Sequence, residues 1–499
     1  MRRPLLDECS IPLELSYCLR TISTKTGLST VVSKKKFAGR TMNRTSVLII
    51  ILCLPVADAA PAVDAARFRI EKSWEIAKVP SGFPVRFCLL TTGNRQYVAY
   101  YDEQRRMTVA SRTLDLNKWH YQVLPAKVGW DSHNYITMAV DRDGQFHVSG
   151  NMHNVKLIYF RTEETGDITT LKRLPMTGDQ EDRATYPKFI TDHEGRLVFT
   201  YRDGASGRGV RIYNRYDLTT RSWSRLLDSP LLDGEGKRNA YPLEPVRGPH
   251  GWFHLVWVWR DTPDCATNHH LCYAQSRDLI HWQSIFGEKV ELPILLSDET
   301  LWVDPVPSGG GIINGCQKLT FDTDNRPIIT YHKSDADGNM QIYAARPEGG
   351  RWGQHVLTEW SEQIKFSGGG SMGFIGIRIS GMSPVKPGLL TMTYRHRDYG
   401  SGRLVVDEKT LRPLNKEIDV VREYPKELDQ IQSDFIGMQI QRAKDIGNSG
   451  DATVRYILQW ETLGPNRDRP RLPPLPKPSA LRLYKLKANG EASTANKAS

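Results

Sequence analysis

The sequence predicts an all-β protein that folds as a single seven-bladed β-propeller. A unit made of a polar strand start, a short turn, an apolar strand and a His or Arg at the strand end recurs about every 50 residues, the usual length of a four-stranded blade with long loops. Runs of alternating aromatic and aliphatic residues, such as 253–259 and 389–394, are typical of strands. No long amphipathic helix pattern interrupts residues 83–486, which hold roughly seven such units.

The N-terminal segment is predicted to be a leader. Arg44 provides a short basic region, residues 47–56 form an apolar core, and Ala57-Asp58-Ala59 fits the small-x-small cleavage pattern. We expect residues 42–59 to be a signal peptide, because the apolar run is too short to span a membrane. Residues 1–41 are then an extra or spurious leader, and the mature protein is secreted or periplasmic without membrane attachment. An uncleaved N-terminal anchor is the alternative.

Residues 67–487 are predicted to be the propeller and the catalytic domain. Residues 464–479 are rich in proline and are expected to form an extended connector to a last strand at 481–486, a candidate for closing the ring. Residues 488–499 are polar and expected to be disordered. The seven units are predicted to begin near Phe83, His133, Tyr186, Tyr241, Gly311, Gly373 and Asp434.

The repeat places reactive side chains at equivalent positions of successive units, which a repeat architecture brings to equivalent places in space. We therefore expect two rings of side chains. The ring at the strand starts would hold His133, Tyr186 and Tyr241. The ring at the strand ends would hold His153, Arg202, Arg260, His332 and Arg395.

Charge and cysteine content restrict the class of protein. The formal net charge is +11, of which residues 1–45 supply +6 through nine Lys or Arg and three Asp or Glu. The remainder is only mildly basic, which argues against a nucleic-acid binder and is compatible with an anionic substrate held in a local basic pocket. Four of the seven cysteines follow the leader, too few for a disulfide framework, although one disulfide is possible.

Several motifs together resemble a known family. They are Asp131-Ser132-His133-Asn134, Gly150-Asn151-Met152-His153, the Tyr186/Arg202 pair, and Trp259 to Asp264 followed by Asn268-His269. This set resembles the BNR-type seven-bladed propellers that include the ulvan lyases of polysaccharide lyase families 24 and 25 and related rhamnose–glucuronate lyases and hydrolases. The resemblance covers roughly residues 83–486.

The resemblance implies roles for individual residues. His133 and Tyr186 would act around the uronate, Arg202 would hold its carboxylate, and His153 would be the second family histidine. Tyr241 would be a further substrate-contacting residue. Asn134, Asn151, Arg260, His332 and Arg395 complete the predicted substrate-binding set, the last two on repeat register alone.

Elimination from a 4-linked uronate needs a cation on the carboxylate, a base for the C5 proton and an acid for the leaving oxygen. Arg202 is the predicted neutraliser, with His133 and Tyr186 sharing the acid and base roles in an order that the sequence leaves open. His153 and Tyr241 would position the substrate or carry protons alternately. Tyrosine can exchange a proton if cations such as Arg202 and Arg260 lower its pKa.

Some of these residues also have structural interpretations. His133 and His153 could be satisfied histidines that line a propeller channel, and Tyr186 and Tyr241 could pack at strand starts. Arg260 could form an ion pair with a neighbouring aspartate, Asp261 or Asp264.

The segment from Cys265 to Cys272, which includes His269 and His270, has residue types that suit a structural zinc. Some relatives implied by the resemblance hold such a zinc. No fourth ligand is evident here, and a loop disulfide or free thiols are the alternatives. We assign no metal to the catalytic residues and no other cofactor.

The predicted function is that of a secreted, monomeric polysaccharide lyase that degrades ulvan-like, rhamnose- and glucuronate-containing polysaccharide. A glycoside hydrolase of the same fold is the first alternative, but hydrolases usually use paired carboxylates, and neither predicted ring contains Asp or Glu. A sialidase is disfavoured because no Arg-Ile-Pro motif occurs. A non-catalytic carbohydrate-binding propeller is the alternative from another class.

Overall fold

The computed structural model describes residues 66–490, and their regular structure is almost entirely β. This part of the chain contains 32 strands and five short 3-10 helices, and no α-helix. None of its helices is long and apolar enough to cross a membrane. The predicted leader segments, 1–41 and 42–59, lie outside the described residues.

Seven antiparallel sheets account for all the strands of residues 66–490. Four of them come from the first two thirds of this range. The first sheet holds β2 (Cys88–Thr92), β3 (Arg95–Tyr101), β4 (Arg106–Thr113) and β5 (His120–Lys127). The second holds β6 (Ile136–Val140), β7 (Phe146–Gly150), β9 (Tyr159–Thr162) and β10 (Leu171–Arg173). The third holds β8 (His153–Val155), β11 (Ala184–Thr191), β12 (Leu197–Ala205), β13 (Arg208–Asp217) and β14 (Ser222–Arg225). The fourth holds β15 (Asn239–Arg247), β16 (Phe253–Arg260), β17 (Asn268–Ser276), β18 (Trp282–Gln283), β19 (Lys289–Val290) and β20 (Trp302–Asp304).

The remaining sheets follow the same plan. The fifth holds β21 (Lys318–Phe321), β22 (Pro327–Ser334), β23 (Met340–Glu348) and β24 (Arg351–Val356). The sixth holds β25 (Ile377–Ile379), β26 (Ser383–Lys386), β27 (Leu389–His396), β28 (Gly400–Asp407) and β29 (Pro413–Leu414). The seventh holds β1 (Phe68–Val79), β30 (Met438–Lys444), β31 (Val454–Leu463) and β32 (Ser479–Ala488). The 3-10 helices are η1 (Ile168–Thr170), η2 (Pro249–Gly251), η3 (Cys265–Thr267), η4 (Glu299–Leu301) and η5 (Lys426–Asp429).

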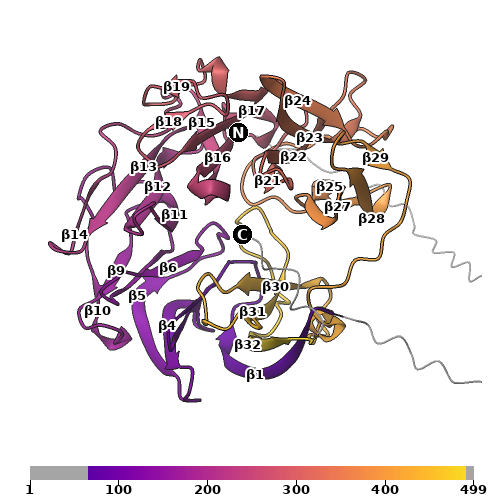
Figure 1. Cartoon of the computed structure of the whole chain (residues 1–499). Coiled ribbons are helices and arrows are strands. Elements are labelled where there is room, and N and C mark those ends of the chain that lie inside the picture. Colours follow the sequence, from indigo (N-terminus) through magenta and orange to yellow (C-terminus); the bar gives the residue numbers. More distant parts are fainter. Residues whose placement is uncertain (1–65, 491–499) are drawn as a thin grey trace, which may run out of the picture. The chain divides into compact units, whose positions relative to one another are not determined.

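The seventh sheet joins the two ends of the described chain. Strand β1 pairs antiparallel with β32, from Phe68 opposite Ala488 to Val79 opposite Ser479, and Figure 1 shows the indigo β1 beside the yellow β32. The last strand is therefore longer than the predicted 481–486. Each predicted unit start lies close to the first long strand of a sheet, so the repeat period corresponds to one sheet per unit.

The strands are buried on both faces where sheets pack on one another. Strand β16 is buried at every residue. Because successive strand side chains point to opposite faces, Leu255 and Trp257 join one hydrophobic cluster while Val256 and Val258 join another. This alternation explains the aromatic-rich runs in the sequence, since each strand fills the space on both of its faces.

The acidic turns of the repeat are fixed by their aspartates. The Asp192 carboxylate accepts hydrogen bonds from the backbone N–H of Glu194 (3.0 Å) and Arg196 (2.8 Å), and also pairs with the Arg196 guanidinium (2.7 Å). Asp322 does the same for the turn that ends at Arg326. These turns are structural and hold the strand pairs in register.

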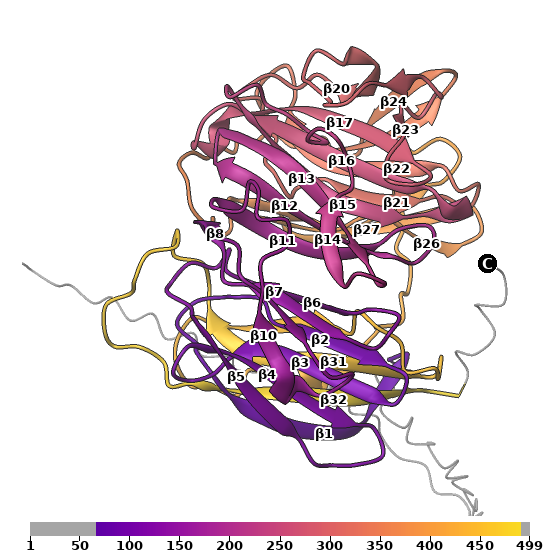
Figure 2. The same ribbon diagram turned by 90° about the vertical axis from the view of Figure 1, so that its left-hand side faces the viewer.

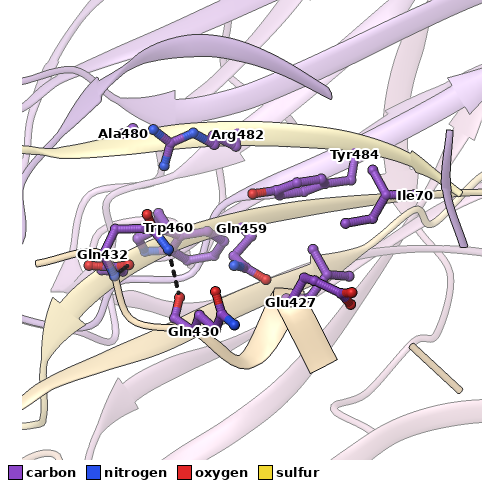
Figure 3. A pocket seen from close by; sticks show the side chains of 11 residues that line it. Ile70, Glu427, Gln430, Gln432, Gln459, Trp460, Ala480, Arg482 and Tyr484 are labelled. Atoms are coloured by element: carbon purple, nitrogen blue, oxygen red, sulfur yellow. Dashed lines mark hydrogen bonds between the residues drawn. The ribbon is translucent and has the colours of Figure 1, made fainter. Parts of the chain in front are cut away.

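A cavity of about 310 Å³ lies against the seventh sheet and beside η5. Gln430, Gln459, Arg482 and Tyr484 line it, together with backbone and side chains of neighbouring residues (Figure 3). None of its lining residues belongs to the predicted catalytic set, which gathers elsewhere.

Candidate active site

Two histidines, one in the loop before β6 and one at the start of β8, share one carboxylate. Nδ1 of His133 lies 2.8 Å from one oxygen of Asp131, and Nδ1 of His153 hydrogen bonds to the other oxygen. The two imidazole rings lie 4.4 Å apart, centroid to centroid. Their side chains are 19% and 29% exposed, so both can be reached from solvent. Since both rings use Nδ1 for the carboxylate, each has Nε2 left for a substrate.

A second carboxylate reaches His133 from the C-terminal part of the chain. Asp468 lies 3.1 Å from Nδ1 of His133, and its carboxylate accepts hydrogen bonds from the backbone N–H of Ser132 (3.2 Å) and Ser371 (2.8 Å). The hydroxyls of Ser132 and Ser371 also hydrogen bond to each other. His133 is thus held between two carboxylates, while His153 has the shared one alone.

Strand register brings the third sheet to the same place. His153 of β8 lies opposite Thr185 of β11, which in turn lies opposite Arg202 of β12. Figure 2 shows β8 beside β11. The Thr185 hydroxyl accepts a hydrogen bond from Nη2 of Arg202 (3.1 Å). His153 and Arg202 therefore lie on the two sides of Thr185, the residue that precedes Tyr186.

Tyr186 sits at a bulge in β11. Its backbone has φ = 57°, in the left-handed region that non-glycine residues rarely adopt, and the pairing of β11 with β12 shifts between Thr185 and Lys188. Pro187, which has no N–H to pair, occupies the bulge. Strained residues of this kind concentrate at functional sites. The bulge turns the Tyr186 ring toward His133, with centroids 5.8 Å apart.

Two buried arginines flank the tyrosines. The Arg202 guanidinium lies 5.0 Å from the centre of the Tyr186 ring, and that of Arg260 lies 5.4 Å from Tyr241. Arg260 donates to the backbone oxygens of Thr262 (2.9 Å) and Pro263. Its hydrogen bonds therefore go to backbone oxygens, and not to the neighbouring aspartates of the alternative interpretation. Nη1 of Arg202 is buried and has no hydrogen-bond partner among the described residues.

Tyr241 completes a line of aromatic rings. Its ring lies 6.2 Å from Tyr186, and its hydroxyl lies 2.6 Å from the Ser206 hydroxyl. Tyr241 is buried, and β15 pairs with β16 without a bulge at this position. The two Tyr-Pro motifs that look alike in the sequence therefore differ, because only Tyr186 is turned out of its strand toward the histidines.

The charges set the protonation of this cluster. Burial alone would lower the pKa of His133, but hydrogen bonds to Asp131 and Asp468 raise it to about 9. The pKa values of the two carboxyls, which burial would raise, are lowered by their hydrogen bonds to the histidines. Burial raises the pKa of Tyr186 to about 12 against the opposing effect of Arg202 and Arg260. The expectation that the arginines give Tyr186 a lowered pKa is therefore wrong, because burial outweighs them.

The other predicted substrate-binding residues have different surroundings. The backbone oxygen of Asn134 accepts a hydrogen bond from Tyr101 (2.6 Å), and Nδ2 of Asn151 donates to Lys127 O (3.1 Å). His332 is buried, with Nδ1 2.9 Å from Gly311 O, and Arg395 stacks on Phe374 at 4.6 Å. In residues 66–490, no hydrogen bond, ion pair or ring contact joins these four side chains to His133, His153 or Tyr186.

Sequence reasoning assigned no role to Asp131, Asp468 and Ser371. Asp131 stands two positions before His133 in the same motif, so the sequence did indicate a carboxylate close to this histidine. Asp468 and Ser371 carry none, because one lies in the proline-rich segment and the other follows a glycine run. Gly370 has φ = 75°, and a Cβ there would lie 2.6 Å from Arg467 O, so glycine lets the two segments meet.

Metal-ligand geometry occurs at the histidine cluster itself. The ligand atoms of Asp131, His133 and His153 lie within 4.8 Å of one another, the one such group in the described part of the chain. These donors could hold a divalent cation, although hydrogen bonds already account for the arrangement. Cys265 and Cys272 are free buried thiols, as are Cys88 and Cys316, so the disulfide alternative does not apply to these four cysteines.

Known proteins match this chain in the family that its sequence motifs resemble. A family model described as a BNR repeat-containing family member matches residues 95–360. The short isoform of ulvan lyase from Alteromonas sp. (strain LOR) is 26% identical over 184 residues, 33% of this chain and 35% of that protein. The long isoform from Pseudoalteromonas sp. (strain PLSV) is 45% identical over 75 residues, 14% of this chain and 8% of that protein. The matches thus span about a third or less of these relatives.

Solved structures share the fold over most of the chain. The polysaccharide lyase Uly1 superposes with a TM-score of 0.56 at 14% identity, covering 84% of this chain and 100% of that one. A family 25 ulvan lyase superposes with a TM-score of 0.54 at 14% identity, covering 83% of this chain and 96% of that one. At such identities the likeness concerns the fold alone.

Proposed function

This chain belongs to the BNR repeat-containing family of ulvan lyase-related proteins, and we propose that it is a polysaccharide lyase that cleaves uronate-containing polysaccharide by β-elimination. The observation that carries the proposal is the pair of histidines on the shared Asp131 carboxylate, next to Tyr186 and its buried arginine. The proposal takes the seven sheets as the blades of a closed propeller. It also includes export through the predicted signal peptide and action as a monomer, which are predictions from the sequence.

The protonation states divide the chemical roles. His133, with a pKa of about 9, is protonated near neutral pH and cannot accept a proton. Tyr186, with a pKa of about 12, is a hydroxyl and about one molecule in 10⁴ is ionised at pH 8. His153 is therefore the proposed base, through the Nε2 that its contact with Asp131 leaves available.

The reaction needs two neighbouring proton transfers. His153 takes the proton from C5, the C5–H electron pair forms the C4=C5 double bond, and the C4–O bond breaks. His133 gives its proton to the departing oxygen. Because C4 and C5 are bonded neighbours, an acid and a base whose rings lie 4.4 Å apart suit this geometry.

Positive charge behind the tyrosines supports binding of the uronate carboxylate. Arg202 lies behind Tyr186 with an unpartnered Nη1, and Arg260 lies behind Tyr241. We propose that the carboxylate binds at the Tyr186 hydroxyl, where the field of both arginines stabilises the charge that grows as C5 loses its proton. In this proposal Arg202 still neutralises the uronate carboxylate, from its position behind the Tyr186 ring.

A glycoside hydrolase is the second candidate, and one observation favours it: two carboxylates, Asp131 and Asp468, do lie at the cluster. Each, however, is engaged with a histidine and has a lowered pKa, so neither is suited to donate a proton as a glycosidase acid must. The hydrolase is therefore less well supported than the lyase.

Incubation of the purified protein with ulvan and other glucuronate-containing polysaccharides tests the proposal. Ultraviolet absorbance of the unsaturated uronate and reducing ends are followed together. We expect both to rise in the wild type and to be lost in His153→Ala and His133→Ala. His281→Ala, which removes an 86% exposed histidine, is the matched control. Reducing ends without absorbance would establish the hydrolase, and binding without either signal would establish a carbohydrate-binding module.

A further inference from the structure

We propose that the cavity between the 365–375 loop and Arg467 is a second anion-binding subsite, which takes a sulfate or carboxylate group on a sugar next to the cleaved uronate. The cavity measures about 480 Å³, a size that fits one substituted sugar ring. This inference rests on the proposed function, since it assigns part of the same polysaccharide to a neighbouring pocket.

The charge of the residues that line the pocket indicates an anionic ligand. Lys365 and Arg467 line it, and its lining contains no Asp or Glu. Nη2 of Arg467 donates to the backbone oxygen of Ser367 (3.3 Å), and neither cation forms an ion pair within residues 66–490. The charge of Arg467 also acts on Asp264, which does not line the cavity, and the two lining cations create a local positive potential that favours an anionic substituent.

Aromatic side chains provide a surface for the sugar ring. Phe366 and Phe374 line the same cavity, and Phe374 is 38% exposed. The Arg395 guanidinium, which does not line the cavity, lies 4.6 Å from the centre of the Phe374 ring. The two phenyl rings therefore offer apolar surface on which a sugar ring can pack.

The pocket is built from the same two segments that hold His133. Arg467 precedes Asp468, whose carboxylate contacts His133, and the Arg467 N–H donates to Ser371 O (3.1 Å). Ser371 in turn donates its N–H to Asp468 (2.8 Å). A polysaccharide that places its uronate at His133 therefore runs close to this cavity, and a group bound there would fix its register.

Kinetics on sulfated and chemically desulfated ulvan test the inference. We expect Lys365→Gln and Arg467→Gln each to raise KM on the sulfated substrate by about 5- to 10-fold, with kcat changed less than about twofold. Lys386→Gln is the control and should leave KM unchanged, because Lys386 is an exposed lysine at the end of β26 that does not line the cavity.

The two substrates separate the possible anions. A rise in KM on sulfated ulvan alone identifies the group as a sulfate ester, and an equal rise on both substrates identifies it as a second uronate carboxylate. An unchanged KM on both would overturn the subsite.

Direct binding keeps the inference testable if the protein does not cleave ulvan. Affinity electrophoresis with sulfated and desulfated ulvan then compares wild type, Lys365→Gln and Lys386→Gln. Weaker retention of Lys365→Gln alone supports the subsite even though the lyase proposal has failed. Equal retention of all three overturns it.

Discussion

Two regions of this molecule each bring two histidines together with an aspartate, yet histidine pKa values shift in opposite directions in the two regions. At the candidate active site, His133 lies between two carboxylates and its pKa is raised to about 9. At the start of β17, His269 and His270 meet Nδ1 to Nδ1 at 2.7 Å, and a single carboxylate, Asp261, contacts His269 at 3.0 Å. Burial lowers the pKa of both of these rings, and the one carboxylate does not compensate.

The difference shows that residue types alone do not make an acid–base site. The number of carboxylates and their sharing decide whether an imidazole is charged. Asp131 serves both rings and Asp468 adds a second carboxylate partner to His133, so the two histidines differ in the number of carboxylates that they contact. Substitutions that alter one of the two regions at a time test this difference.

Removing the shared carboxylate should have the largest effect. We expect Asp131→Asn to lower kcat/KM by about 10³-fold or more, because both histidines lose the partner that fixes their tautomer and orientation. Asp261→Asn makes the same change at the second histidine pair and should alter kcat/KM less than about threefold. Initial rates of absorbance increase and thermal melting of each variant measure this contrast. Equal losses in the two variants would mean that Asp131 acts through stability.

Tyr186 should matter more than Tyr241 despite the shared Tyr-Pro motif. We expect Tyr186→Phe to lower kcat by about 10²-fold, since it removes the hydroxyl of the aromatic ring that lies against His133. Tyr241→Phe should cost about tenfold or less, because its hydroxyl is already engaged with Ser206. Steady-state kinetics on one polysaccharide preparation compare the two. A larger loss for Tyr241→Phe would reverse the assignment.

Asp468 should set the alkaline limit of activity. In the wild type, kcat/KM should fall as pH rises through about 9, because His133 then loses the proton that it donates. Asp468→Asn removes one of the two groups that raise this pKa, so the alkaline limb should move to lower pH by about one unit. The same shift applies to stability: the raised pKa stabilises the fold below about pH 6.5, an effect lost as pH rises through about 9. A pH–rate profile with an unmoved alkaline limb would remove Asp468 from the account.

Chelation should have the smallest effect. We expect treatment with EDTA followed by gel filtration to change the rate by less than about twofold, because hydrogen bonds already satisfy Asp131, His133 and His153. Metal analysis of the same sample accompanies the rates. Loss of activity on chelation, restored by Zn²⁺ or Ca²⁺, would make the three residues a metal site.

Much of the architecture could be predicted from the sequence because it is periodic. The Asp-initiated turn recurs between β6 and β7, between β11 and β12 and between β21 and β22, and the unit starts were visible at intervals of about 50 to 70 residues. The motifs around His133, His153, Tyr186 and Arg202 were visible for the same reason, since each stands at a repeat-equivalent strand start or end. The pairing of β1 with β32, which joins the two ends of the described chain, could be predicted only in part, because the sequence indicated a last strand but not its partner.

The rest depends on contacts that no local pattern encodes. Asp468 lies in a segment that its prolines identify only as an extended connector, and its approach to His133 depends on packing against the glycine run before Ser371. The pKa of Tyr186 was misjudged because the cationic neighbours are recognisable in the sequence and the depth of burial is not. Long-range packing, more than residue identity, therefore sets the chemistry of this site.

A histidine titration by NMR tests the central claim most directly. The protein is labelled at histidine ¹³Cε1, and His133→Gln, His153→Gln and His269→Gln assign the signals. The account predicts that His133 remains protonated up to about pH 9 while His269 and His270 titrate below their usual range. If His133 instead titrated near pH 6.5, like an ordinary exposed imidazole, the proposed division of acid and base between His133 and His153 would be contradicted.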